Sequence, residues 1–207
     1  MVVLELSAFS STAAAAAQPP DPTATIKSVI DQTIAVFKDR SINPAARQAR
    51  LRAIAEQHFD FAEMARSTVG YHWREFTPEQ QKEFVPLFTS FIEDVYLDQI
   101  QRYSVQRIQK DIQSTNIDFT KQQLDGAGDA EVFSTVITTE RATPIPVNYR
   151  MTLVDGVWRI YDLTVDSISV MGNYRNQFNR VLNNGGYDKL VSIMREKQQA
   201  LAGTLAQ

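Results

Sequence analysis

The sequence predicts an α+β protein, in which helices from both ends of the chain cover one face of a curved antiparallel sheet of four or five strands. Apolar residues recur at helical spacing up to about residue 103 and again after residue 174, and at a spacing of two in between. The order of helices, strands and helices favours layers of separate kinds over an alternating α/β sheet. We therefore expect a cone of sheet and helices around an apolar interior.

The strongest strand signal is a hairpin centred on Asp155-Gly156, which stands between two alternating runs. A two-residue hairpin turn needs positive φ angles, which Gly adopts freely. This turn predicts four cross-strand pairs, which are Val154–Val157, Leu153–Trp158, Met151–Ile160 and Tyr149–Asp162. Partners across two strands share a face. One face of the hairpin should therefore be apolar, with Val147, Tyr149, Met151, Leu153, Trp158 and Ile160.

Helix-start signals divide the first hundred residues. Asp21-Pro22 and Asn43-Pro44 each combine an N-cap residue with a Pro at the first helical position. They predict helices to about Arg40 and His58, the second with Arg47, Arg50 and Arg52 mostly on its solvent side. Phe61, Met64, Ala65 and Thr68 form the stripe of a third helix, which Gly70 should end.

A long helix follows the capping box of Thr77 to Gln80. It should reach about Tyr103, with an apolar face broader than a surface helix needs. That face carries Phe84, Leu87, Phe88, Phe91 and Val95, and is widened by Ile92 and Tyr96.

Alternating runs predict strands at residues 105–113, 117–124 and 132–139, with a turn at residues 125–128. Pro144 and Pro146 should mark the exit of the third strand and an edge of the sheet. After the hairpin, Tyr174 to Leu182 is helical in its spacing. Gly185-Gly186 should break the chain before a last helix that carries Leu190, Met194 and Leu201.

Composition limits the function classes. Hydrophobic residues make up 43% and charged residues 22% of the 207 residues, which fits one globular domain, expected at residues 21–200 with a C-terminal tail at 201–207. The net charge of −3 argues against nucleic-acid binding. Cysteine is absent, and His58 and His72 are the only histidines, so neither a disulfide nor a metal site is predicted. No GxSxG turn or phosphate-binding loop is present.

The first 20 residues favour two interpretations. The run Ala13 to Ala17 resembles the end of an export signal, but no Lys or Arg occurs before Lys27. Residues 1–20 are therefore expected to be the remnant of an export signal whose start is missing. A disordered, Ala-rich tail is the alternative.

Two further features are open to a structural or a functional interpretation. Asp162 should lie on the side of Trp158 and Ile160, where an apolar interior would suit a general base. Alternatively, it caps a backbone group or pairs with an Arg near the strand end. The 11 Phe, 7 Tyr and 2 Trp would serve equally a solid core or a hollow interior.

The segment WRIYDLTVDSISVMGNYRNQF (residues 158–178) resembles the MlaC family, also called the toluene-tolerance family. The likeness extends upstream to FDFAEMARSTVGYHWREFTPEQQKEFVPLFTSFIEDVY and covers roughly residues 24 to 198 in all. Its most specific parts are Trp158, Tyr161-Asp162, Asn173-Tyr174-Arg175 and Gln177-Phe178. Asp166-Ser167 departs from the Glu-Gly-like pair that members usually carry at this turn.

The resemblance implies a non-enzymatic periplasmic carrier with an NTF2-like cone and no cofactor other than the phospholipid it transports. Its partners would be an MCE-domain subunit of an inner-membrane ABC transporter and an outer-membrane lipoprotein complex, and the carrier would be a monomer that maintains outer-membrane lipid asymmetry. The residues expected to contact the acyl chains are Phe61, Met64, Phe84, Phe88, Phe91, Val95, Val147, Tyr149, Met151, Leu153, Trp158, Ile160, Val170, Tyr174 and Phe178. The alternative is a small cone-fold enzyme that acts on an apolar substrate with Asp162 as general base.

Overall fold

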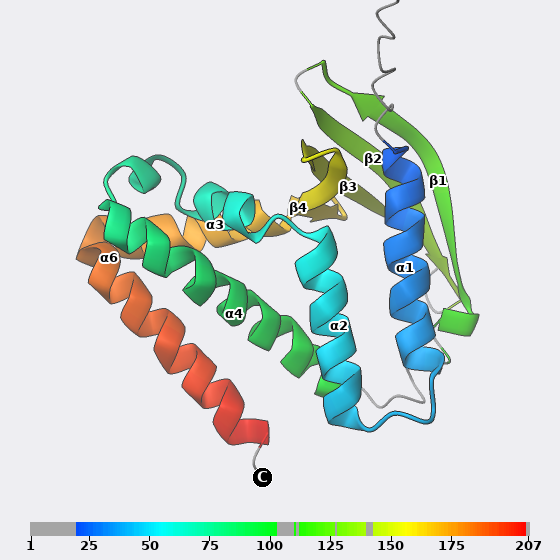
Figure 1. Cartoon of the computed structure of the whole chain (residues 1–207), viewed down its shortest axis with the longest axis horizontal. Helices are drawn as coiled ribbons and strands as arrows, with labels where there is room; N and C mark the ends of the chain where they lie inside the picture. Colours follow the sequence, from blue (N-terminus) through cyan, green and yellow to red (C-terminus); the bar gives the residue numbers. More distant parts are fainter. Residues whose placement is uncertain (1–19, 103–109, 111, 127, 140–142, 206–207) are drawn as a thin grey trace, which may run out of the picture.

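The computed structural model describes residues 20–102, 110, 112–126, 128–139 and 143–205, and the expected export-signal remnant lies almost wholly outside them. Helices flank one five-stranded antiparallel sheet, as the sequence predicts (Figure 1). The first helices are α1 (Pro22–Lys38), α2 (Pro44–His58), α3 (Phe61–Val69), the 3₁₀ helix η1 (Gly70–Arg74) and α4 (Pro78–Arg102). They are followed by β1 (Thr115–Leu124), β2 (Asp129–Thr138), β3 (Ile145–Val154), β4 (Val157–Val165), β5 (Ile168–Ser169) and α6 (Val170–Leu205).

The helices begin where the capping residues predict. Asp21 accepts a hydrogen bond from the Thr23 amide, and Asn43 accepts one from the Ala46 amide. Ahead of α4 the capping box is complete, because the Thr77 amide donates to Gln80 Oε1 at 2.9 Å and the Gln80 amide donates to Thr77 Oγ1 at 3.2 Å. These local contacts satisfy amides that have no partner within a helix, and they fix where each helix starts.

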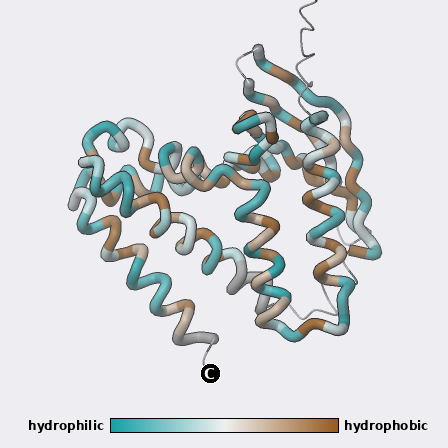
Figure 2. The backbone as a smooth tube through the Cα atoms, viewed as in Figure 1, coloured by the Kyte–Doolittle hydropathy of each residue, from teal (hydrophilic) through white to brown (hydrophobic). Residues whose placement is uncertain are grey.

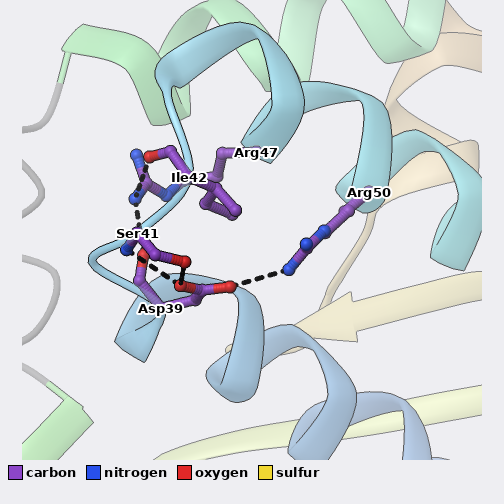
Figure 3. A network of polar contacts seen from close by, with 5 residues as sticks. All are labelled: Asp39, Ser41, Ile42, Arg47 and Arg50. Carbon is purple, nitrogen blue, oxygen red and sulfur yellow. Dashed lines mark hydrogen bonds and ion pairs between the residues drawn. The ribbon is translucent and has the colours of Figure 1, made fainter.

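A polar network holds the turn between α1 and α2 (Figure 3). Asp39 accepts hydrogen bonds from the amide and hydroxyl of Ser41 and pairs with Arg50 at 2.8 Å. These contacts, led by the Ser41 hydroxyl, lower the pKa of Asp39. Arg47 donates to the Asp39 carbonyl at 3.0 Å, where the carbonyls at the end of α1 lack helical partners. The network therefore links the start of α2 to the end of α1.

The sheet has the strand order β1-β2-β3-β4-β5, so each strand pairs with its neighbour in the chain. The predicted turn at Asp155-Gly156 is present, with φ angles of 51° and 79°. The pairs Val154–Val157, Leu153–Trp158 and Met151–Ile160 are also confirmed. The apolar face packs against α1 as one cluster, with Ile26 among Met151, Trp158 and Ile160.

The fourth predicted pair is wrong, because the register shifts between Met151 and Arg150. Tyr161 is the extra residue of a β-bulge, so Tyr149 pairs with Leu163 and Arg150 pairs with Asp162. The bulge moves Asp162 out of alternation with Trp158 and Ile160. The Arg150 guanidinium carbon lies 5.1 Å from the centre of the Tyr161 ring.

Two other expectations about the sheet need correction. The strand expected at residues 105–113 falls largely outside the described residues, and Lys110, Ile112 and Gln113 are helical. The fifth strand is instead the two-residue β5 after β4. Pro146 does not mark an edge, because it lies in the interior strand β3 opposite Thr135. It lies beyond the last β3–β4 pair, Val147–Val165, and its carbonyl accepts a hydrogen bond from the Asp166 amide at 3.0 Å in the turn after β4.

The helices form a second core beside the sheet. α3, α4 and α6 enclose Phe84 and Phe88, which are fully buried, together with Phe178, Leu190 and Met194. α6 is interrupted at Gly186, whose φ of 69° and ψ of −167° are not helical, as the Gly185-Gly186 pair predicts. Figure 2 shows hydrophobic residues recurring along these helices between hydrophilic ones. The sheet core and the helical core are thus separate clusters, and α2 and the start of α6 lie between them.

Candidate functional site

A largely apolar cavity of about 400 Å³ lies between the two cores. Each of the four helices α1 to α4 contributes to its wall, and β4 and the first turn of α6 complete it. The size and the apolar lining are those of a site for an apolar small molecule. The lining residues are Val29, Thr33, Leu51, Arg52, Ile54, Ala55, Phe59, Phe61, Met64, Ile92, Glu93, Tyr96, Asp162, Leu163, Val165, Val170 and Met171.

A second space of about 550 Å³ runs between α4 and α6. We call it the α4–α6 groove. Tyr96, Val165 and Val170 line both the groove and the cavity, so the two spaces adjoin at these side chains. The remaining groove residues are Phe91, Val95, Ile168, Asn173, Tyr174, Gln177, Phe178, Val181, Leu190, Ile193, Met194 and Lys197.

The sequence-predicted lipid contacts fall into three groups. The cavity is lined by Phe61, Met64 and Val170, and the groove by Phe91, Val95, Tyr174, Phe178 and again Val170. Phe84 and Phe88 line neither space, because they lie in the helical core. The hairpin residues also line neither space, because they belong to the cluster that packs against α1. These hairpin residues are Val147, Tyr149, Met151, Leu153, Trp158 and Ile160. Contact between lipid and any of these side chains stays a prediction.

The sequence reasoning missed the contribution of α1 and α2 to the cavity. Val29 and Thr33 of α1 and Leu51, Ile54 and Ala55 of α2 line it. Their helical spacing was visible in the sequence, but it shows only that a helix has an inner face and not whether that face meets a core or a space. Arg52 was expected on the solvent side of α2, and instead it too lines the cavity.

Asp162 is held as a structural carboxylate. It is buried, with 6% of its surface exposed, and accepts hydrogen bonds from the amides of Leu163 at 2.8 Å and Met171 at 3.0 Å. Ser169 donates its hydroxyl to the second carboxylate oxygen at 2.6 Å and accepts from the Gly172 amide at 2.8 Å. Asp162 and Ser169 together therefore cap the start of α6, and the geometry favours the capping interpretation over that of a general base.

Glu93 is the other buried carboxylate of the cavity wall. Its Oε2 lies 3.8 Å from Arg52 Nη1, which is too long for a hydrogen bond, while Arg52 Nη2 pairs with Asp94 at 2.7 Å. Burial raises the pKa of Glu93, and the nearby carboxylates of Glu56 and Asp94 add to this effect against the attraction of Arg52. The cavity thus holds one carboxylate that is costly to ionise.

Burial also raises the pKa of the tyrosines beside the groove. The pKa of Tyr174 rises to about 12, chiefly by desolvation and also through Tyr96. The pKa of Tyr96 is raised by desolvation and by the nearby Asp162 carboxylate. Both hydroxyls therefore stay neutral at physiological pH, which suits an apolar groove. Within the described part of the chain, no cluster of His, Cys, Asp and Glu could hold a metal ion, and no helix is long and apolar enough to cross a membrane.

An open antiparallel sheet with helices around an apolar cavity defines a class of small α+β proteins whose interior has room for an apolar molecule. The sequence profile of the MlaC protein matches residues 27–196, and the chain belongs to the MlaC family. A similar solved structure is that of a phospholipid-binding protein from Ralstonia solanacearum in complex with a phospholipid. It is 24% identical, with a TM-score of 0.71 over 88% of this chain and 99% of that chain. A search of curated proteins found no match.

Proposed function

We propose that this protein is a periplasmic carrier that binds a phospholipid by its acyl chains and carries it between the inner and outer membranes. The observation that carries the proposal is the cavity of about 400 Å³ together with the adjoining groove of about 550 Å³. Membership of the MlaC family supports it, as does the phospholipid bound to the similar protein from Ralstonia solanacearum.

The physical chemistry of lipid transfer explains why such a space is needed. Moving two acyl chains with about 30 methylenes in total from an apolar phase into water raises the free energy by on the order of 24 kcal/mol, at about 0.8 kcal/mol for each methylene. A free phospholipid therefore crosses an aqueous gap too slowly to be useful. A carrier lowers this barrier when the chains stay in apolar surroundings with few polar groups left without partners.

Thr33 and Asp162, two polar side chains of the cavity wall, have hydrogen-bond partners within the protein, as a carrier of acyl chains requires. Thr33 donates its hydroxyl to the Val29 carbonyl at 2.8 Å, and Asp162 accepts from three donors. These groups are satisfied within the protein and do not compete for the acyl chains. Met64 and Met171 add flexible side chains to the wall, which adapt to chains of different shape.

We further propose which residues bind the lipid, where the carrier works and which partners it meets. Residues 21–200 form the lipid-binding unit, and the carrier works as a monomer in the periplasm. It exchanges lipid with an MCE-domain subunit of an inner-membrane ABC transporter and with an outer-membrane lipoprotein complex, and so maintains outer-membrane lipid asymmetry. We assign no catalytic step to the site, and phospholipid is cargo rather than cofactor.

Lipid uptake and release test this function directly. Delipidated protein is mixed with vesicles of fluorescent phospholipid, separated from them, and then mixed with unlabelled acceptor vesicles. We expect uptake of about one phospholipid for each protein molecule and its later delivery to the acceptors. Failure of the delipidated, folded protein to take up any phospholipid would overturn the proposal.

A further inference from the structure

One polar atom in the cavity wall stands apart from the others. Glu93 lines the cavity with 9% of its surface exposed, and its Oε1 has no hydrogen-bond partner among the residues that the structure describes. By contrast, the side chains of Thr33 and Asp162 are satisfied. A buried carboxylate oxygen without a partner is costly, typically by more than a neutral polar group. Its presence in a largely apolar wall therefore calls for a partner that arrives with the ligand.

The charges around Glu93 indicate what that partner is. Arg52 is the cation nearest to Glu93, and its Nη2 is already engaged by Asp94 at 2.7 Å. Glu56 adds a third carboxylate to the electrostatic surroundings of Glu93. Glu93 therefore has one guanidinium and two further carboxylates in its surroundings, and a cation that can donate hydrogen bonds would complete the site.

Arg52 supplies a complementary group beside Glu93. Its Nε is buried and likewise lacks a partner among the described residues, while its side chain as a whole is 35% exposed. An unused guanidinium N–H favours a phosphate oxygen. The two unpartnered atoms therefore offer one acceptor for a cation and one donor for an anion, on side chains whose Arg52 Nη1 and Glu93 Oε2 atoms are 3.8 Å apart.

We propose that Glu93 and Arg52 form a headgroup subsite for an aminophospholipid, whose primary ammonium binds Glu93 and whose phosphate binds Arg52. This inference rests on the proposed function and adds a headgroup preference to it. A primary ammonium carries three N–H donors. The quaternary ammonium of choline carries none and is recognised by aromatic faces instead. An anionic headgroup without an amine would meet the carboxylates unfavourably.

The test is a competition between headgroups on identical acyl chains. Delipidated protein is incubated with vesicles of equimolar dioleoyl phosphatidylethanolamine, phosphatidylcholine and phosphatidylglycerol, and the bound lipid is measured by mass spectrometry. We expect the ethanolamine lipid to exceed the choline lipid about tenfold, the ratio that one charge-assisted hydrogen bond supplies. Glu93→Gln, which keeps the shape of the side chain, should reduce this ratio to near one.

Glu79→Gln is the matched control, because it removes the same charge from an exposed position of α4. It should keep the preference of the wild type. Glu93→Leu gives a second test that removes the carboxylate without a hydrogen-bonding group, and thermal unfolding checks that each variant is folded. Equal binding of the three lipids by the wild type, or an unchanged preference in folded Glu93→Gln and Glu93→Leu, would overturn the subsite and leave the carrier function standing. Absence of any bound lipid in the wild type would overturn the carrier function, and the subsite with it.

Discussion

The carboxylate of Asp162 accepts a hydrogen bond of 3.0 Å from the Met171 amide, and this contact joins the end of β4 to the first turn of α6. The same carboxylate receives the Ser169 hydroxyl. The first turn of α6 forms part of the wall between the cavity and the groove, because Val170 lines both. Asp162 therefore positions a wall of the proposed lipid site.

Removal of this cap should destabilise the protein. Asp162→Ala leaves two amides and one hydroxyl without their acceptor, and we expect a loss of about 2 kcal/mol in the free energy of unfolding. Asp162→Asn keeps one carbonyl oxygen and should lose less. Urea unfolding measures both, with Asp188→Ala at an exposed position of α6 as control. Equal stability of Asp162→Ala and Asp188→Ala would contradict the capping role.

The turn between β4 and β5 carries backbone strain. Asp166 and Ser167 have φ angles of 50° and 67°, a region that residues other than Gly, Asn and Asp seldom adopt. Ser167→Gly should therefore raise the free energy of unfolding by about 0.5–1 kcal/mol. Ser28→Gly, in the middle of α1, should lower it. Thermal or urea unfolding distinguishes these opposite signs, and a loss of stability in Ser167→Gly would count against the strained turn.

Two alanines on α2 allow a matched test of the cavity. Ala55 lines the cavity, whereas Ala53 is exposed on the same helix. Ala55→Phe should occupy space otherwise open to two or three methylenes of a bound chain. Because these methylenes are no longer buried, the binding free energy becomes about 2 kcal/mol less favourable, and phospholipid binding should weaken more than tenfold. Ala53→Phe should bind as the wild type does. Titration with short-chain phospholipid gives both affinities, and equal affinities would show that the cavity holds no lipid.

The raised pKa of Glu93 predicts a pH dependence of stability. Because the folded protein holds this proton more tightly than the unfolded chain does, stability should fall as pH rises from the usual pKa of about 4.5 towards the raised folded value. Glu93→Gln lacks this ionisation. The wild type should therefore lose stability relative to Glu93→Gln over that interval, as urea unfolding from pH 4 to pH 8 would measure. If the difference in the free energy of unfolding between the two proteins stayed constant with pH, or if the wild type gained stability relative to Glu93→Gln, the raised pKa of Glu93 would be contradicted.

Local signals in the sequence were sufficient for most of the elements. The caps at Asp21, Asn43 and Thr77 and the turn at Asp155-Gly156 act over a few residues, so their consequences are visible in the sequence. The bulge at Tyr161 was not predictable in this way. Contacts such as that of the Asp162 carboxylate with the Met171 amide are not visible in the alternation of apolar and polar residues. Alternation alone therefore placed Asp162 opposite the wrong residue.

The candidate site was predicted less completely than the fold. Periodicity correctly gave the inner faces of α3 and α4, and Phe61, Met64, Phe91 and Val95 line the cavity or the groove. The same reasoning placed Phe84 and Trp158 on inner faces, and these residues lie in solid clusters. An inner face that meets a space has the same hydrophobic pattern as one that meets another element. Only the packing of the whole chain distinguishes them.

Native mass spectrometry of the purified protein, followed by solvent extraction of its contents, tests the carrier function most directly. We predict a species heavier than the bare chain by the mass of one diacyl phospholipid, and recovery of that lipid in the extract. A bare chain that is folded, and that stays bare after incubation with phospholipid vesicles, would contradict the proposal that the cavity and the α4–α6 groove bind phospholipid.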